Sequence, residues 1–214
     1  MLTDFKLFRN LSPDESEKLA AYFKQCCFGK KQHVEFSGPS QDYIYLVRTG
    51  RVKVSYLSPE GKEVIVTILQ PGDIYSMHSE ASTTVMEPAE IWYIGLENFK
   101  KIVMQNPGLT VNLIRILGII LKNTNDALLN LAFKEVNSRL ANLLLKMARE
   151  TGVTSDRGIV FEMGLTHEEI ANIISSTRQT VTSVLNRFEK AGIIDVQKKR
   201  ITVKNMEQLA EMSK

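Results

Sequence analysis

The spacing of apolar and polar positions changes along this chain, and its first half is dominated by short alternating runs. Between Lys30 and about Ile94, apolar runs such as YIYLV, RVKVSYL, EVIVTIL and EIWYI are separated by turn residues, including the pair Thr49 and Gly50. Runs of this length between glycine and proline residues are typical of short antiparallel strands. The segment therefore predicts an antiparallel β-roll.

Helical spacing precedes this predicted roll. Ser12 and Pro13 mark the start of a helix that we expect to run to about Gln25. Leu19 and Phe23 fall on one face of it.

A short helix over 96–104 and a long helix over 108–133 are predicted after the roll. The apolar positions of the long helix follow alternating steps of three and four residues: Ile114, Leu117, Leu121, Leu128 and Leu131, with Thr124 at the missing position. This is a heptad repeat, which favours a parallel homodimer over the core helix of a monomer.

Two further helical patterns meet at a tight turn in the last third of the chain. The first begins at Thr166, which has Glu169 in the position of a capping box, and the second begins near Thr177. Ser175 and Ser176 form the turn between them. The pattern is that of a helix-turn-helix, although a surface helical hairpin would show similar amphipathic spacing.

The second of these helices has one apolar and one polar face. Its apolar positions are Val181, Val184, Leu185 and Phe188. Arg178, Gln179 and Ser183 face outward and are candidates for base reading, since arginine bonds guanine and glutamine bonds adenine in the major groove. Five basic side chains are candidates for phosphate contacts: Arg187, Lys190, Lys198, Lys199 and Arg200.

A small hairpin is expected to follow. Gly192 ends the helix, and β-prone stretches over 193–197 and 201–203 flank the basic run KKR. This order predicts a winged helix-turn-helix. The chain as a whole is therefore expected to be an α+β protein, with an effector roll over 1–107, a dimerisation helix over 108–134 and a DNA-binding domain over 135–214.

The charge distribution agrees with this division. The chain has 214 residues and a net charge of +3, and residues 134–214 carry 13 Lys and Arg against 10 Asp and Glu, while the rest of the chain is balanced. Because this excess of positive charge is small, DNA binding should depend on one particular face of a dimer rather than on the overall charge. Paired recognition helices require an inverted-repeat operator.

Other sequence features exclude several classes of protein. Cys26 and Cys27 are the only cysteines, which argues against a disulfide framework, an iron-sulfur cluster or a cysteine-rich zinc site. No signal peptide is recognisable, and the best apolar stretch is interrupted by Arg115 and Lys122, so we expect a cytoplasmic protein. No phosphate-binding loop, zinc-protease motif or nucleophile elbow is present, and we expect no enzyme.

The order of roll, long helix and winged helix-turn-helix resembles the cyclic AMP receptor and fumarate-nitrate reductase regulator (CRP/FNR) superfamily over nearly the whole chain. The resemblance implies an effector-gated transcription factor, most simply an activator that contacts RNA polymerase. In that superfamily the base-facing positions correspond to Thr177, Arg178, Gln179 and Ser183.

The effector follows from a narrower resemblance. No arginine lies between Arg51 and Arg115 to pair with a cyclic phosphate, which disfavours a cyclic nucleotide. The segment Gly-Asp-Ile-Tyr-Ser-Met-His-Ser over 72–79 is similar to an element of the haem-containing carbon-monoxide sensors of the superfamily. That similarity implies one haem b per subunit, carbon monoxide as effector, His78 as an iron ligand, and Leu117, Gly118 and Leu121 lining the haem and the gas.

Two positions differ from those sensors. Ser76 replaces the cysteine that binds ferric haem, and the chain starts with Met1, whose amine would be the second iron ligand. His33 and His167 lack a matching context, and His167 is expected to be exposed. The alternatives are a family member gated by a non-haem small molecule, an effector-independent repressor and, least of all, an enzyme.

Overall fold

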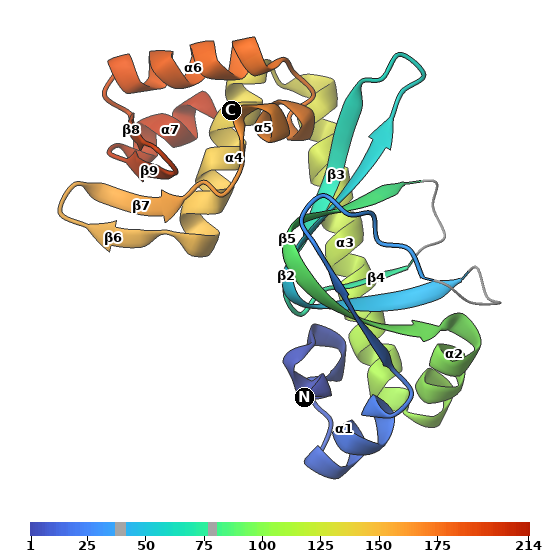
Figure 1. Ribbon diagram of the computed structural model, residues 1–214. Coiled ribbons are helices and arrows are strands. Elements are labelled where there is room, and N and C mark those ends of the chain that lie inside the picture. The colour runs from blue at the N-terminus through green and yellow to red at the C-terminus, as the bar shows by residue number, and fades with distance from the viewer. Residues whose placement is uncertain (37–41, 77–80) are drawn as a thin grey trace. The chain divides into compact units, whose positions relative to one another are not determined.

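The computed structural model describes residues 1–36, 42–76 and 81–214, which form two compact units, Met1–Lys122 and Asn123–Lys214 (Figure 1). The long helix α3 crosses the boundary between them. The elements of the first unit, in chain order, are η1 (Leu2–Asp4), η2 (Lys6–Phe8), α1 (Pro13–Ala20), β1 (Lys24–Phe28), β2 (Tyr43–Leu57), β3 (Glu63–Leu69), β4 (Ile74–Ser76), β5 (Ser82–Gly95), α2 (Leu96–Gln105) and α3 (Pro107–Phe133).

One antiparallel sheet with strand order β1-β5-β2-β3 makes up the roll, and β4 pairs with the start of β2. The two longest strands, β2 and β5, pair along most of their length, with shifts in register near their middle. Such bulges increase the local twist and let a long strand bend. This allows β2 to pair with β4 near its start and with β3 near its end. The predicted antiparallel roll is confirmed.

The predicted break at Thr49 and Gly50 is wrong, because β2 continues through it as one strand. Gly50 has a φ of 77°, and a Cβ atom there would lie 2.5 Å from the Pro88 carbonyl oxygen of β5. The glycine therefore permits a bulge and a close approach of backbones inside the strand pair rather than a chain reversal.

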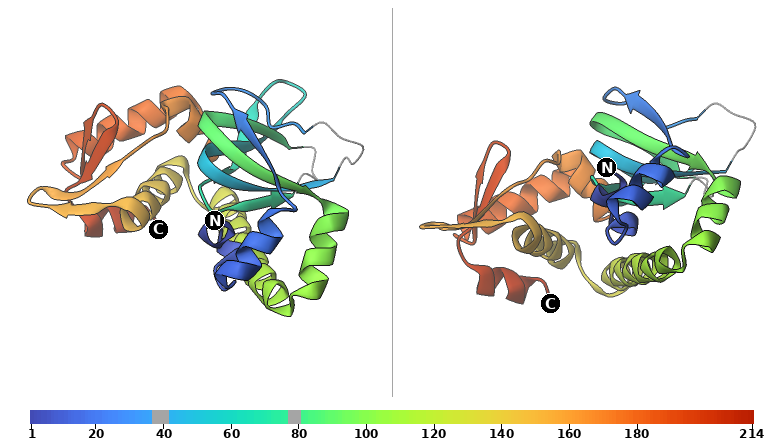
Figure 2. Two further views of the ribbon diagram at one scale, coloured as in Figure 1. Left: turned by 60° about the horizontal axis from the view of Figure 1, so that its bottom comes forward. Right: turned by 90° about the horizontal axis from the view of Figure 1, so that it is seen from below.

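Alternate residues of β2 face two different cores. Tyr45 and Val47 pack inside the roll, whereas Ile44 and Leu46 pack on its other side. The second core is completed by the N-terminal segment 1–11, called here the N-terminal arm, and by α1, α2 and the start of α3 (Figure 2). Four arm side chains are almost fully buried there: Leu2, Phe5, Leu7 and Phe8.

The first helix ends earlier than its sequence pattern predicts. The capping box forms as expected, with the Ser12 amide donating to Glu15 at 2.8 Å, but α1 stops at Ala20 rather than near Gln25. Lys24 and Gln25 instead begin β1, where they pair with Tyr93 and Trp92 of β5. Long-range strand pairing here outweighs local helix propensity.

The two helices after the roll match their predicted ranges closely. The start of α3 packs into the second core through Leu109 and Asn112. Its five predicted heptad leucine and isoleucine side chains remain 41% to 65% exposed in the single chain. An apolar stripe of this kind is what a partner helix would cover.

Among the described residues, no single helix is long and apolar enough to cross a membrane. Taken together, α2 and α3 have the length and composition of a membrane span, but the two helices are bent by 116° relative to each other.

The second unit is built around one core. After the end of α3 its elements are α4 (Val136–Thr151), β6 (Val153–Ser155), β7 (Gly158–Glu162), α5 (His167–Ile173), α6 (Arg178–Lys190), β8 (Ile194–Gln197), β9 (Arg200–Val203) and α7 (Met206–Met212). The strands form an antiparallel sheet in the order β6-β7-β9-β8. The predicted helix-turn-helix and hairpin are confirmed as α5, α6 and β8-β9. The sequence reading did not resolve α4, α7 or the pair β6-β7.

Candidate nucleic-acid interface and effector region

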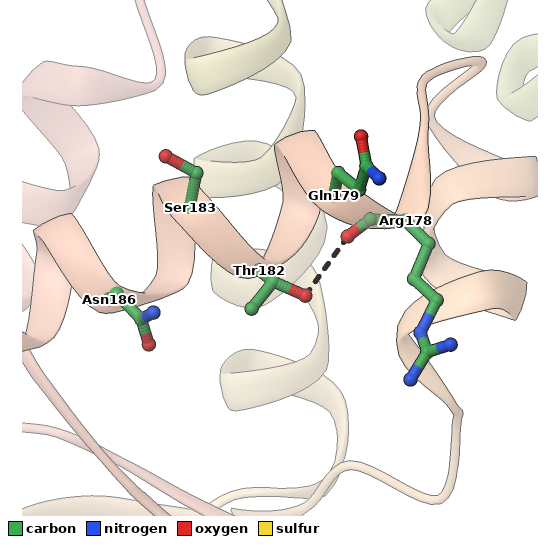
Figure 3. A pocket seen from close by; sticks show the side chains of 5 residues that line it. All are labelled: Arg178, Gln179, Thr182, Ser183 and Asn186. Atoms are coloured by element: carbon green, nitrogen blue, oxygen red, sulfur yellow. Dashed lines mark hydrogen bonds between the residues drawn. The ribbon is translucent and has the colours of Figure 1, made fainter.

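One face of α6 is open and forms a shallow hollow. It is lined by Arg178, Gln179, Thr182, Ser183 and Asn186, whose side chains project from the same side of the helix (Figure 3). Arg178, Gln179 and Ser183 are exposed, as predicted, while Val181, Val184, Leu185 and Phe188 are buried beneath them. Donors and acceptors on this helix face, called here the recognition face, suit the edges of bases in a major groove.

Thr182 and Asn186 were not singled out from the sequence. Both lie on the line of residues that starts at Arg178 and continues in steps of four along the helix. This spacing places side chains on one helix face, so it was a signal that could have identified them.

The start of α6 is fixed by its own side chains. The Thr177 hydroxyl accepts a hydrogen bond from the Thr180 amide at 3.2 Å and lies 2.8 Å from the Thr180 hydroxyl. Thr177 is thus the N-cap of α6, an arrangement that orders the first turn next to Arg178.

His167 links α5 to α6 and is half-buried, so the prediction that it is exposed is wrong. The Thr182 hydroxyl donates its hydrogen to the Arg178 carbonyl at 3.0 Å and lies 2.9 Å from His167 Nδ1. A hydroxyl has only one hydrogen, so when Thr182 donates to the Arg178 carbonyl it accepts from the His167 ring nitrogen. His167 thus connects the start of α5 to α6 through Thr182.

The lysines among the predicted phosphate contacts lie at the end of α6 and on the β8-β9 hairpin. Lys190, Lys198 and Lys199 are exposed, and Lys198 takes a φ of 54° at the tip of the β8-β9 hairpin. The Lys199 carbonyl accepts from the Met163 amide at 2.7 Å, which anchors the hairpin backbone.

The two arginines of the predicted phosphate set have protein partners. Arg187 is exposed, and its guanidinium donates to the Asn137 side-chain oxygen of α4. Arg200 lies 3.7 Å from Glu162, with both side chains mostly exposed. Exposed pairs of this kind contribute little to stability and leave the guanidinium groups accessible.

The segment over 72–79 and the residues around it are called here the effector region, and the structure describes this segment only up to Ser76. His78 lies outside the described residues, as do its neighbours 77, 79 and 80. The preceding turn is tightly held: the Gln70 amide donates to the Asp73 carboxylate at 2.8 Å, and the Lys6 amide donates to the Gly72 carbonyl at 3.1 Å. The Lys6 ammonium also forms an ion pair with Asp73. The N-terminal arm thus touches the turn that leads to His78.

Two buried hydroxyl groups beside this segment have no hydrogen-bond partner among the described residues. They belong to Tyr45, inside the roll, and to Ser76, at the end of β4. Burial first, and the nearby Tyr75 second, raise the pKa of Tyr45, and the nearby Thr83 side chain lowers it by less, so its hydroxyl stays protonated. An unpaired buried hydroxyl is unfavourable, which marks these positions as ones where a bound group could supply a partner.

Met1 is held at the surface by an ionic network. Its amine lies 2.9 Å from the Asp4 carboxylate, which also pairs with Arg48 of β2. Arg48 donates to the Met1 carbonyl at 3.1 Å and lies over the Trp92 ring. Hydrogen bonds from the N-terminal amine first, and from Arg48 second, lower the pKa of Asp4.

The three candidate residues of α3 lie on an open helix face. Leu117 and Leu121 are exposed, and a Cβ atom added to Gly118 would meet nothing within 4 Å. Gly118 is therefore not needed for packing inside one chain. The face is accessible to a second subunit or to a flat ligand.

Comparison with known proteins gives matches along most of the chain. Residues 26–106 match the cyclic nucleotide-binding domain, and residues 138–212 match the Crp-like helix-turn-helix domain. A mutant of CooA from Carboxydothermus hydrogenoformans has a solved structure that is 35% identical and superimposes with a TM-score of 0.86, covering 92% of this chain and 90% of that one.

Two curated relatives have names that do not refer to carbon monoxide. The global nitrogen regulator of Synechococcus elongatus is 29% identical over 208 residues, which cover 93% of this chain and 91% of the relative. The CRP-like cAMP-activated global transcriptional regulator of Mycobacterium tuberculosis is 26% identical over 216 residues, which cover 97% and 96%. All three relatives match this chain over most of its length, but their names differ: nitrogen regulation, activation by cAMP, and CooA.

Proposed function

Because this chain belongs to the CRP/FNR family of dimeric, DNA-binding transcription regulators, we propose that it is a haem-dependent member that responds to carbon monoxide. The homodimer binds an inverted-repeat operator and, most simply, activates transcription by contacting RNA polymerase.

The observation that carries this proposal is the likeness to CooA, which is named as a CO-dependent transcription factor and is 34% identical over the whole of this chain in its imidazole-bound structure. The sequence of the segment over 72–79 supports the proposal separately, because it resembles an element of the haem-containing carbon-monoxide sensors in which His78 corresponds to an iron ligand. Histidine is a common ligand of haem iron.

The described residues fit a haem group. The Ser76 and Tyr45 hydroxyls, which lack partners, are hydrogen-bonding groups beside the proposed site. Leu117 and Leu121 offer apolar surface on either side of Gly118, where the absence of a side chain leaves room for a flat macrocycle. When bound, the haem would supply the metal centre to which the gas binds.

His78 and Met1 are the proposed iron ligands. The Met1 amine is ion-paired with Asp4, so it must lose its proton and leave this carboxylate before it can bind a metal. That competition weakens Met1 as a ligand relative to a neutral histidine. A weak ligand is one that a gas molecule replaces readily, and its release would allow the Met1 amine to pair with Asp4 again.

The arm and α3 then connect the effector region to the dimer. Lys6 contacts the turn at Gly72 and Asp73, and the arm packs against the start of α3. Gas binding changes DNA affinity only if it favours one arrangement of the α3 pair over another. Leu117, Gly118 and Leu121 are the residues of α3 that would contact the haem and the bound gas.

The recognition face performs the readout. Arg178 and Gln179 offer bidentate contacts to guanine and adenine, and Ser183 and Thr177 offer single hydroxyls. Arg187 and Lys199 flank this face and contact phosphates, which fixes the register on the duplex.

A non-haem small molecule is the second candidate effector. It is favoured by the match of residues 26–106 to the cyclic nucleotide-binding domain and by the curated relatives. A cyclic nucleotide itself fits poorly, because no arginine lies between Arg51 and Arg115 to neutralise its buried phosphate.

Absorption spectroscopy of haem-loaded, reduced protein, before and after carbon monoxide, tests the proposal. We expect one haem per subunit and a saturable change with the gas, both lost in His78→Ala and retained in His33→Ala. His33 is the matched control, since its Nδ1 lies 3.3 Å from the Ser82 hydroxyl, outside the segment over 72–79. Unchanged haem uptake in His78→Ala would reject this ligand, and no uptake by the wild type would favour the non-haem effector.

A further inference from the structure

Four hydrogen bonds surround the junction between α3 and α4. Lys134 directly follows α3, and its amide donates to the Asn130 carbonyl at 3.0 Å. Its carbonyl accepts from Arg139 Nη1 at 3.1 Å, and its ammonium donates to the Ser213 carbonyl at 2.6 Å. Ser213 also accepts from the Asn142 side chain at 3.0 Å. The junction is therefore fastened to α4 and to the C-terminal end of the chain.

Arg139 extends this arrangement to the helix-turn-helix. Its second terminal nitrogen, Nη2, donates to the Ser175 carbonyl at 3.4 Å. Ser175 forms the turn between α5 and α6, and the amide of Ser176 donates to the Ala171 carbonyl at 2.9 Å. One guanidinium thus joins the end of the dimer helix to the turn that starts the recognition helix.

The Ser175 turn needs such support. Ser175 has a φ of 50°, a left-handed conformation that is unfavourable for residues with a side chain. An arrangement of this kind persists only where neighbouring groups hold it in place. The Arg139 guanidinium supplies a charged donor to the Ser175 carbonyl, and a charged donor strengthens a hydrogen bond relative to a neutral one.

Ion pairing does not explain the position of Arg139. Within residues 1–36, 42–76 and 81–214, no carboxylate pairs with its guanidinium, and its buried Nε has no partner. Both contacts are to backbone carbonyls at fixed places in the fold. The planar fork of arginine reaches two such acceptors at once, whereas lysine has a single nitrogen.

We propose that Arg139 is a positioning residue for DNA binding, which couples the end of the dimer helix at Lys134 to the Ser175 turn and so to the first residues of the recognition helix. The inference rests on the DNA-binding role of the family and is independent of the identity of the effector. Through Arg139, a change in the path of α3 at Lys134 would reach the Ser175 turn and the first residues of α6, Arg178 and Gln179, next to it.

Hydrogen exchange of the free protein, followed at single amides, tests this coupling. In Arg139→Met and Arg139→Lys we expect the Ser176 amide to exchange at least about tenfold faster, because the turn loses a charge-assisted hydrogen bond. The Gly152 amide, bonded to the Ala148 carbonyl at 3.1 Å in the same unit, should exchange as in the wild type. Arg149→Met is the matched control, since Arg149 is an exposed arginine of the same helix.

DNA affinity provides the second readout, measured with a duplex that the wild-type protein itself selects from a random-sequence pool. Both Arg139 variants should bind it about tenfold more weakly, and Arg149→Met should bind it like the wild type. Wild-type exchange at Ser176 in Arg139→Lys would overturn the proposal. Equal acceleration at Ser176 and Gly152 would also overturn it, since that would indicate a general loss of stability. Because exchange is followed without haem, gas or DNA, a failure of the carbon-monoxide proposal leaves this test intact.

Discussion

The side-chain nitrogen of Asn112 in α3 donates a hydrogen bond to the carbonyl oxygen of Leu7 at 3.1 Å, across 105 residues of sequence. Asn112 is 8% exposed and Leu7 is fully buried. The contact joins the dimer helix directly to the N-terminal arm, which in turn touches the Gly72 turn through Lys6. The effector region and the dimer helix are therefore connected by a short chain of bonded groups.

Removal of the Asn112 side chain should destabilise the protein. Asn112→Ala leaves the buried Leu7 carbonyl without this donor, and we expect a loss of about 1–3 kcal/mol in the free energy of unfolding. Urea unfolding measures it. Asn123→Ala, an exposed asparagine of the same helix, is the control with the same change in helix propensity. Equal losses in the two variants would contradict the importance of the Leu7 contact.

The network at the N-terminus should respond to acid. The pKa of Asp4 is lowered by its hydrogen bonds, so its contribution is present above its ordinary value of 3.8 and is lost as the pH falls through the lower folded value. Trp92 is the single tryptophan, and its ring centre lies 5.8 Å from Arg48 Cζ, so its fluorescence reports locally on this network. We expect Trp92 fluorescence in Asp4→Asn to differ from the wild type near neutral pH and to converge with it in acid. A difference that persists in acid would argue against this assignment.

Arg178 should contribute to sequence discrimination. Arg178→Ala removes a bidentate donor from the recognition face, and we expect a loss of about 1–3 kcal/mol in binding to the selected operator with little change for unrelated DNA. Competition binding with the two duplexes separates these effects. A uniform loss on both duplexes would reassign Arg178 to the phosphate backbone.

Lys199 should behave in the opposite way. Its exposed ammonium on the β8-β9 hairpin is placed for a phosphate, so Lys199→Ala should weaken binding to all sequences. The slope of log affinity against log salt should fall by about 1. Titrations at several salt concentrations measure this, and an unchanged slope would place Lys199 away from the DNA.

Tyr45→Phe tests whether the buried hydroxyl in the roll is structural. Because this hydroxyl has no hydrogen-bond partner among the described residues, its removal should leave the thermal stability of the ligand-free protein equal or higher. The melting temperature of the ligand-free protein measures it. A clear fall in stability would mean that the hydroxyl is paired in the folded protein.

Local sequence patterns were sufficient to predict the two helices of the helix-turn-helix, α5 and α6. The Thr166 and Glu169 capping box forms with bonds of 2.7 Å and 3.1 Å, and the apolar spacing of α6 predicted its buried side. Both depend on residues three or four positions apart, which interact wherever the helix is placed. The exposure of Arg178, Gln179 and Ser183 followed from the same spacing.

Contacts between distant segments decided the rest. The sequence by itself determined the order of roll, long helix and winged helix-turn-helix, because periodicity and turn residues act locally. Only the tertiary structure ended α1 at Ala20, carried β2 through Gly50 and placed Arg139 between Lys134 and Ser175. Strand pairing and buried hydrogen bonds depend on which partners the fold brings together, and a partner more than thirty residues away leaves no periodic trace in the chain.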